Sequence, residues 1–245
     1  MPYPRERVMI ALATCRREIG GVTMPLQAQS GAQSRVTQPY WGYEHIGIFF
    51  FVLVLLAALV RLAVRTHFLS PSELVTPSLG VQGSIIVLLT IALYGILKWR
   101  HHQPVVRPLG WVVPSALQTT LALAAGIAFA LGTAFFTHLR RQVIPSMPVI
   151  DFLVLGLFLG PILEESLFRG CLLPVIARTF GSVFAVIATA LLFAVFHGPT
   201  DLAHWFWFTA TGVAYGCVRL VSQTTTAAAF MHATYNLTLF VAARF

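Results

Sequence analysis

The sequence predicts an all-α membrane protein, a polytopic bundle of about seven to eight transmembrane helices. Of its 245 residues, 57% are hydrophobic and only 10% are charged, whereas soluble domains carry about 25% charged residues. The mean hydropathy is +0.80. The apolar residues form long continuous runs, and the sequence lacks the short alternating strands of a membrane barrel. Helices are therefore expected, because a helix satisfies its own backbone hydrogen bonds in lipid.

The N-terminal region differs in composition from the rest of the chain. Residues 1–40 are polar and basic, and we expect a disordered arm there, ahead of a transmembrane domain at 41–245. The one apolar stretch of the arm, 8–15, is followed by Arg16 and Arg17 and lacks the longer core and small-residue cleavage site of a secretory signal. Met24 is an alternative true start of the chain.

Seven apolar segments follow the arm, each near the roughly 20 residues that a helix needs to cross hydrocarbon. A Gly160-Pro161 pair interrupts the fourth segment, where proline removes a backbone donor and is expected to kink the helix. The predicted spans are 46–64, 81–97, 116–137, 149–175, 181–196, 202–221 and 225–243.

The basic residues indicate an orientation and exclude one class of partner. Ten of the lysines and arginines that flank the predicted spans lie on the side of the N-terminus and four on the other, which favours a cytoplasmic N-terminus. The net charge of +8 does not indicate nucleic-acid binding, because the basic residues lie in short segments between apolar runs and form no stripe. The lipid bilayer is the expected partner, and the compact chain, rich in alanine and arginine, is typical of a bacterial inner (plasma) membrane protein.

Six polar residues lie where a membrane helix does not tolerate them without a reason. An ionisable group near the centre of the bilayer costs at least about 2.5–3.5 kcal/mol on insertion scales. Polar clamps between helices explain single cases, but a cluster in the last four segments indicates a functional site. The six are Glu164, Glu165, Arg169, His197, His232 and Asn236.

The spacing of these residues places them on shared helix faces. Glu165 and Arg169 are four residues apart and can form an ion pair. Glu164 lies about 100° around the helix from Glu165, so it is free to face a cavity. His232 and Asn236 also share one face of the last segment.

Secondary expectations concern residues outside this cluster. Gly212 and Gly216 predict close packing between helices. Asp201 is expected to cap the start of a helix. Trp205 and Trp207 are expected to lie at the membrane interface. No CxxC pair is present, and two of the cysteines are expected to be small core residues. The histidines at span ends are expected at the interface or in solvent. The two cysteines are Cys171 and Cys217. The histidines are His45, His67, His101, His102, His138 and His204.

The cluster fits hydrolysis of a peptide bond by more than one route. A carboxylate with a histidine can deprotonate a water, and a second histidine with an amide can stabilise the developing oxyanion. Glu164, His197 and His232 could instead bind zinc and leave one position for water. The sequence has no HExxH or GxSxG motif, and Ser166 is a poor candidate nucleophile.

Three motifs in order resemble one known family. Residues 164–169 read EExxxR, 193–197 read FxxxH and 232–236 read HxxxN. This pattern resembles the CPBP family of CAAX proteases and bacteriocin-processing enzymes, also called Abi. The resemblance covers a protease-like core at about 149–240, and the Gly212 and Gly216 spacing resembles a further motif of that family.

The resemblance implies an intramembrane endopeptidase whose catalytic cavity lies within the helical bundle. By position, Glu164 and His197 would activate water, and His232 and Asn236 would form the oxyanion site. Glu165 and Arg169 would support the site. The resemblance favours a mechanism without a cofactor. Zinc held by Glu164, His197 and His232 is the alternative, in line with the metalloendopeptidase label that the family long carried.

The expected substrate is a protein or peptide presented from the membrane and cut near its C-terminus or membrane anchor. Bacteriocin-like peptides and the C-terminal anchors of exported proteins fit a bacterial chain better than prenylated proteins. Two other classes compete with the enzyme. One is a non-catalytic membrane scaffold or immunity protein. The other is a small transporter, which would show an internal repeat, and no clear repeat is present.

Overall fold

The computed structural model describes residues 39–70, 79–99, 102, 104–137, 148–199 and 201–244. Every regular element in these residues is a helix, and no strand occurs among them. The all-α fold predicted from the sequence is confirmed for this part of the chain. The predicted arm at 1–40 lies outside the described residues except for Pro39 and Tyr40.

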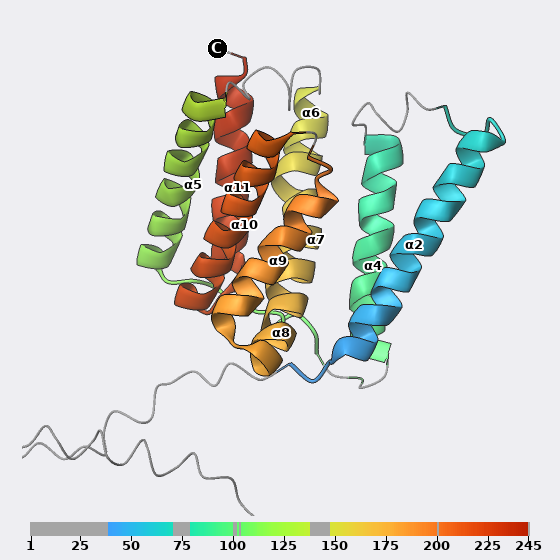
Figure 1. Ribbon diagram of the computed structural model, residues 1–245, viewed down its shortest axis with the longest axis horizontal. Helices are drawn as coiled ribbons and strands as arrows, with labels where there is room; N and C mark the ends of the chain where they lie inside the picture. The colour runs from blue at the N-terminus through green and yellow to red at the C-terminus, as the bar shows by residue number, and fades with distance from the viewer. Residues whose placement is uncertain are drawn as a thin grey trace, which may run out of the picture. The chain divides into compact units, whose positions relative to one another are not determined.

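The helices follow the predicted apolar segments closely (Figure 1). The third segment, α5, has the predicted bounds, and the fourth is a continuous run from α6 to α8 that contains two π-helical stretches. The bounds are α2 (Tyr43–Arg65), η1 (Leu79–Gly83), α4 (Ser84–Trp99), α5 (Ala116–Thr137), α6 (Val149–Asp151), η3 (Phe152–Leu159), α7 (Gly160–Glu165), η4 (Ser166–Leu172), α8 (Leu173–Phe180), α9 (Ser182–Phe196), α10 (Leu202–Ser222) and α11 (Thr225–Ala242).

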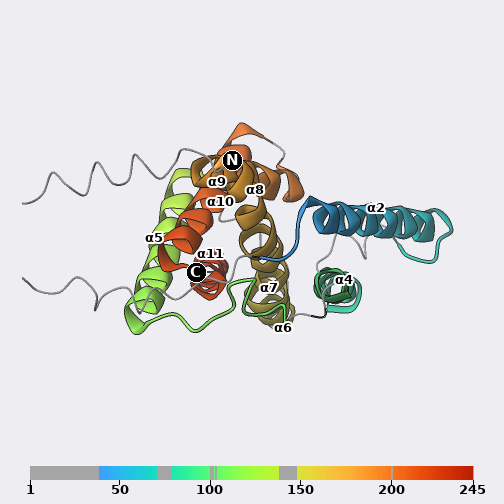
Figure 2. The same ribbon diagram turned by 90° about the horizontal axis from the view of Figure 1, so that it is seen from below.

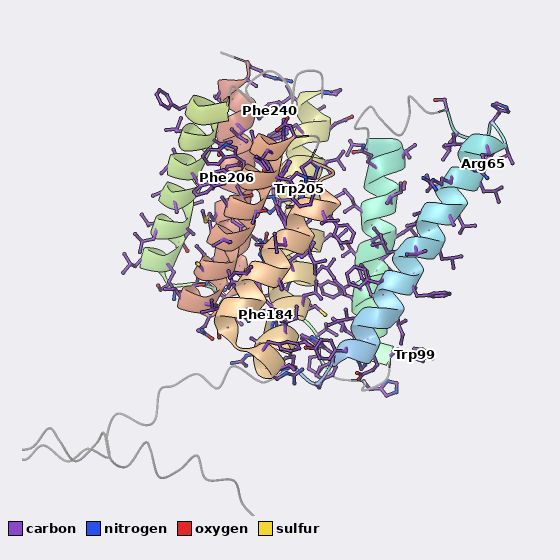
Figure 3. All side chains as sticks on the ribbon, viewed as in Figure 1. Arg65, Trp99, Phe184, Trp205, Phe206 and Phe240 are labelled. Atoms are coloured by element: carbon purple, nitrogen blue, oxygen red, sulfur yellow. The ribbon has the colours of Figure 1, made fainter. Side chains whose placement is uncertain are left out.

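The outer surface of the bundle is apolar, as expected for a membrane protein. Large side chains such as Phe184 and Phe206 are more than half exposed and project from the outer surface (Figure 3). By length and composition, three helices in the described part of the chain can each cross a membrane: Tyr43–Arg65, Leu79–Trp99 and Ala116–Phe135. None of the described helices in the four later segments meets the same criteria of length and composition, and Ser182–Phe196 is apolar but shorter. Seven to eight crossings stay a prediction.

The proline in the fourth segment produces a change of helix type. Residues 152–159 are π-helical and Pro161 lies in the first turn of α7. A proline ring collides with the carbonyl four residues earlier in an α-helix, and the wider π-turn relieves this contact. Gly160 is needed at the junction, because a Cβ there would lie 2.8 Å from the carbonyl oxygen of Leu155. The expected local distortion therefore takes the form of a π-helix.

Glycines allow the helices that hold the site to pack closely. A Cβ at Gly212 in α10 would lie 2.8 Å from the Cα of Ala190 in α9, and one at Gly216 would lie 3.1 Å from Val186. The close packing predicted for these two glycines is confirmed. Gly126 plays the same part between α5 and α11, where a Cβ would lie 2.5 Å from the carbonyl oxygen of Met231.

The helices α2 and α4 pack against each other beside this group, and α4 contacts α7 of the fourth segment (Figure 2). The hydroxyl of Tyr43 in α2 donates to that of Thr179 in α8. The indole of Trp41, just before α2, donates to the carbonyl of Cys171 at 3.3 Å. The hydroxyl of Tyr94 in α4 is 3.0 Å from the hydroxyl of Ser166 in η4, and the indole of Trp111 donates to the same oxygen at 3.0 Å. These contacts connect α2 and α4 to the segment that carries the two glutamates.

Two secondary expectations were wrong. His45, predicted to be interfacial or solvated, is buried, because it lies in the first turn of α2 where its ring accepts from the backbone of Gly42. Cys217, predicted as a core residue, is exposed on α10, whereas Cys171 is buried as expected. Sequence hydropathy could not separate the two cysteines, since both lie in apolar segments whose two faces differ only by packing.

Replacement of Gly212 by alanine is expected to destabilise the bundle by about 1–3 kcal/mol, because the backbone of α9 must move to admit the methyl group. Thermal unfolding of the purified protein in detergent measures this effect. Gly132→Ala is the matched control, since a Cβ at Gly132 in α5 meets nothing within 4 Å. An equal melting temperature for the two variants would contradict the close α9–α10 contact.

Candidate active site

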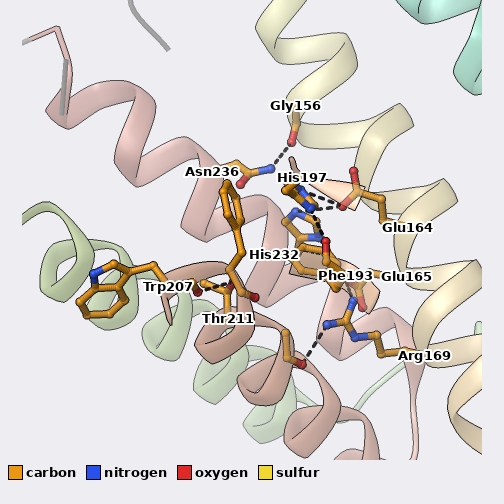
Figure 4. Close-up of polar contacts among 12 residues, drawn as sticks. Gly156, Glu164, Glu165, Arg169, Phe193, His197, Trp207, Thr211, His232 and Asn236 are labelled. Carbon is orange, nitrogen blue, oxygen red and sulfur yellow. Dashed lines mark hydrogen bonds and ion pairs between the residues drawn. The ribbon is translucent and has the colours of Figure 1, made fainter. Parts of the chain in front are cut away.

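Four helical segments bring the six predicted polar residues together (Figure 4). Glu164 and Glu165 end α7 and Arg169 lies in η4. His197 is the residue at which α9 ends, and His232 and Asn236 lie on α11. The residues come from separate segments, so their meeting depends on the tertiary fold.

The centre of the cluster is a fully buried ion pair. Arg169 donates to Glu165 at 3.2 Å, and neither side chain is exposed. The same carboxylate oxygen of Glu165 lies 2.9 Å from Nδ1 of His232. Arg169 also donates to the carbonyl of Gly212 at 2.9 Å. Glu165 and Arg169 therefore connect α7, η4, α10 and α11, as the predicted supporting role requires.

Aromatic rings surround the arginine on its apolar sides. The guanidinium carbon lies 4.8 Å from the ring centre of Phe193 and 5.2 Å from that of Tyr215. Cation–π contacts of this kind are worth about 2 kcal/mol or more when water is excluded. These contacts offset part of the cost of burying the arginine's charge. Phe193, the phenylalanine of the FxxxH motif, thus contributes to the site by packing against Arg169.

Glu164, about 100° around the helix from Glu165, faces a cavity. Its Oε2 lies 3.8 Å from Nε2 of His197 and 3.8 Å from Nε2 of His232. This oxygen is shielded from solvent and has no hydrogen-bond partner in the structure. A buried acceptor without a partner is costly, so the arrangement calls for a ligand between Glu164 and the two rings.

Both histidines are oriented by acceptors on their Nδ1 atoms. Nδ1 of His197 is 2.8 Å from the carbonyl oxygen of Phe193. A carbonyl can only accept, so Nδ1 donates and Nε2 of a neutral ring is left to accept. Nδ1 of His232 donates in the same way to Glu165. The ring of His197 is also stacked on Phe208 with centroids 4.6 Å apart. Each Nε2 is thereby directed toward Glu164.

Asn236 reaches the cavity from the same face of α11 as His232. Its Nδ2 donates to the carbonyl of Gly156 at 2.9 Å. Gly156 lies in the π-helix η3. The bond fixes the plane of the amide and uses one of its two N–H groups, so the second stays available to a bound group.

The cavity has a volume of about 230 Å³. It contains four of the predicted residues: Glu164, His197, His232 and Asn236. The other walls come from apolar and aromatic residues, among them Phe152, Leu155, Trp207, Phe208, Tyr235 and Leu239. These residues belong to the start of η3, the first part of α10 and the later part of α11, so the cavity lies toward the end of the bundle that holds the C-terminus (Figure 1).

His204, in the first turn of α10, also lines the cavity. Asp201 accepts a hydrogen bond from the backbone N–H of His204 at 2.9 Å, which confirms the predicted cap of α10. This bond and a second one from the His204 ring hold the pKa of Asp201 below its ordinary value. The spacing of Asp201 and His204 at the start of a helix was the signal that could have placed His204.

Ser166 takes no part in the cavity. It is fully buried, and its hydroxyl accepts from Trp111 and bonds with Tyr94. Its rejection as a nucleophile agrees with this position.

The zinc alternative was tested against the placement of its three candidate ligands. Zinc–nitrogen bonds of about 2.0–2.1 Å with tetrahedral angles would put ligand atoms about 3.4 Å apart. Both measured separations are 3.8 Å. Among the residues that the structure describes, no group of three or more His, Cys, Asp or Glu side chains is arranged to hold a metal ion. The two separations are therefore slightly longer than those of a formed zinc site.

The segment that contains this site matches a known protein family. Residues 145–238 match the family described as type II CAAX prenyl endopeptidase Rce1-like. The resemblance indicated by the three motifs is confirmed over this segment, which contains all six residues of the cluster. Comparison with curated proteins and with solved structures gave no match. The Rce1-like segment supports a peptidase in general, and a membrane location fits both the family and the apolar helices.

Replacing Arg169 by methionine is expected to destabilise the protein by about 3–5 kcal/mol, because Glu165 would keep a buried charge without its partner. Adding Glu165→Gln to this variant should restore part of the loss. Thermal unfolding of the single and double variants measures the coupling between the two side chains.

Arg178→Met is the matched control, because Arg178 bonds only backbone carbonyls, those of Pro39 and Trp41. Additive effects of Arg169→Met and Glu165→Gln would show that the ion pair does not hold the site together.

Proposed function

We propose that the Rce1-like segment is an intramembrane endopeptidase in which Glu164 and His197 activate a water molecule. The observation that carries this proposal is the buried Oε2 of Glu164, which has no hydrogen-bond partner and faces the Nε2 atoms of two oriented histidines. A water molecule beside these three atoms could form hydrogen bonds with Glu164 and with the histidines. The arrangement is therefore suited to hold a reactive water.

The distances leave room for that water. A hydrogen bond to water spans about 2.8 Å, so one oxygen beside the 3.8 Å line can bond both Glu164 and His197. With both groups acting as acceptors, water donates its two protons to them and directs its lone pairs toward the substrate. Glu164 then takes a proton as the oxygen attacks the carbonyl carbon, and it passes that proton to the leaving amine as the C–N bond breaks.

His232 and Asn236 are proposed to stabilise the oxyanion. The free N–H of the Asn236 amide can donate to the tetrahedral oxygen. His232 can donate from Nε2 only when both ring nitrogens carry protons, since Nδ1 already donates to Glu165. The Glu165 carboxylate is the counterion for that form of the ring, which gives this glutamate its place in the site.

We further propose a bundle of about seven crossings in a bacterial inner membrane, with the N-terminus in the cytoplasm. The cavity lies toward the opposite end of the bundle from the start of α2 (Figure 1). Its peptide substrate would then reach the site from the outer half of the membrane. That direction fits the membrane anchor of an exported protein or a bacteriocin-like peptide.

Glu164→Gln is expected to lower cleavage of a membrane-anchored fluorogenic peptide library by about 10²–10⁴-fold, because glutamine cannot accept the proton. Activity is measured with purified protein in liposomes, with and without a chelator. Glu44→Gln is the control, since Glu44 lies in α2 and its carboxylate is exposed. Cleavage that survives chelation and disappears in Glu164→Gln is the expected result.

The other outcomes separate the remaining alternatives. Activity that chelation abolishes and zinc restores would assign Glu164, His197 and His232 as ligands after a small closure of the site. No cleavage of any peptide, by a protein that still complements a deletion strain, would leave the scaffold or immunity protein.

Asn236→Ala is expected to lower kcat by about 10²–10³-fold with little change in KM, because an oxyanion donor acts mainly in the transition state. Thr238→Ala, two residues further along α11, is the control and should leave kcat unchanged, since its hydroxyl bonds only the carbonyl of Thr234. A rise in KM at constant kcat would contradict the oxyanion role and indicate that Asn236 binds substrate.

A further inference from the structure

A second buried arginine lies far from the cavity, near the end of α10. Arg219 is only 5% exposed, yet no hydrogen bond or ion pair holds its guanidinium among the residues that the structure describes. Its Nε is fully buried without a partner. A buried charge of this kind is expected to have a counterion.

The guanidinium lies beside the start of another helix. A Cβ at Gly110 would lie 3.1 Å from a terminal nitrogen of Arg219 and 3.1 Å from the backbone nitrogen of Thr225. Thr225 begins α11, and its N–H donates to the carbonyl of Gly110 at 2.8 Å. A positive side chain therefore adjoins the positive end of an 18-residue helix, an arrangement that favours a bound anion.

The rest of this end of the bundle offers little negative charge. Lys98 and Arg178 lie in the last turns of α4 and α8, and Arg107 lies in the loop between α4 and α5. The one acidic residue of the described chain at this end is Glu44, in the first turn of α2, where its carboxylate is 3.0 Å from His45. These helix ends lie at the same end of the bundle, at the bottom of Figure 1. Apart from Glu44, the described chain therefore offers no carboxylate at this end of the bundle as a counterion for Arg219.

An apolar groove adjoins the same loop and the same helix start. It has a volume of about 350 Å³ and is lined by Trp111, Val113, Pro114, Thr226 and Phe230 among others. Trp111 follows Gly110 directly, and Thr226 follows Thr225. A cationic site next to an apolar groove at the end of a membrane helix matches a molecule with a charged head and a hydrocarbon chain.

We propose that Arg219 and the start of α11 bind the phosphate of an anionic phospholipid, whose acyl chain lies in the groove beside Trp111 and Phe230. The guanidinium supplies paired donors to the phosphate oxygens, and the helix end supplies its positive potential. The position of Arg219 in the last turn of α10 is favourable for a cation by itself. A purely structural role on that ground is the alternative that the test must separate.

The test measures the thermal stability of the purified, delipidated protein on addition of phosphatidylglycerol, phosphatidylcholine or inorganic phosphate. Phosphatidylglycerol is expected to raise the melting temperature of the wild type, because a ligand of the folded state stabilises it. Arg219→Met should weaken the apparent affinity by about tenfold or more, the size of a lost charge-assisted contact. Arg107→Met removes the same charge from the exposed part of the loop and should leave the effect intact.

Each result has one meaning. Protection by phosphatidylglycerol that Arg219→Met loses and Arg107→Met keeps supports the lipid site. Equal protection by inorganic phosphate supports the phosphate site but overturns the lipid as its source. Equal protection of both variants overturns the role of Arg219, and no protection of the wild type overturns the site.

A second measurement does not depend on a variant that folds. A photoreactive phosphatidylglycerol analogue, with its reactive group near the head, is expected to label 110–114 and 226–230 in the wild-type protein, as mapped by mass spectrometry. Labelling spread evenly over the outer surface of α2, α5 and α9 would show that lipid has no preferred place at Arg219.

Discussion

The buried ion pair between Glu165 and Arg169 is the interaction on which the rest of the site depends. Its members lie on one helix, but their other contacts reach His232 on α11 and the carbonyl of Gly212 on α10. Burying two charges is expensive unless the remaining polar atoms are also satisfied. The pair meets this demand in part, because Oε2 of Glu165 and Nε of Arg169 have no partner. Its contacts to the Gly212 carbonyl and to His232 form only with α10 and α11 in place, so the pair makes the relative position of these helices specific. The glycine contacts between α9 and α10 then hold His197 at the same depth.

The two adjacent glutamates show how one helix can supply both support and chemistry. Glu165 points into the protein and has its charge balanced, whereas Glu164, about 100° around the helix, points into the cavity with an oxygen that lacks a partner. Because Glu165 fixes the helix and the ring of His232, Glu164 needs no contact of its own to be positioned. Its oxygen can be left for a reactant. In the proposed mechanism, this separation of roles explains why the site uses two neighbouring carboxylates rather than one.

The sequence predicted the contacts that depend on spacing within one helix. The Glu165–Arg169 pair, the shared face of His232 and Asn236 and the cap at Asp201 all follow from helical geometry. The sequence did not predict contacts between helices. Asn236 bonds the carbonyl of Gly156, 80 residues away, and that carbonyl belongs to a π-helix that no periodicity reveals. For the same reason the sequence did not indicate that His204 lines the cavity, since the wall that it forms exists only when α10 packs beside α9 and α11.

Arg169 and Arg219 form a natural comparison within the protein. Both are buried arginines. Arg169 bonds a carboxylate and a backbone carbonyl and is surrounded by aromatic rings. Arg219 bonds neither a carboxylate nor a carbonyl among the residues that the structure describes. The sequence has only eight acidic residues against 16 lysines and arginines, so most of its basic groups must find negative charge elsewhere. At the surface water and salt suffice. For a guanidinium whose Nε is buried without a partner at the end of a membrane helix, the phosphate of the surrounding lipid is the nearest abundant anion. The protein thus balances one buried arginine internally, where geometry must be fixed, and leaves the other for the membrane to balance.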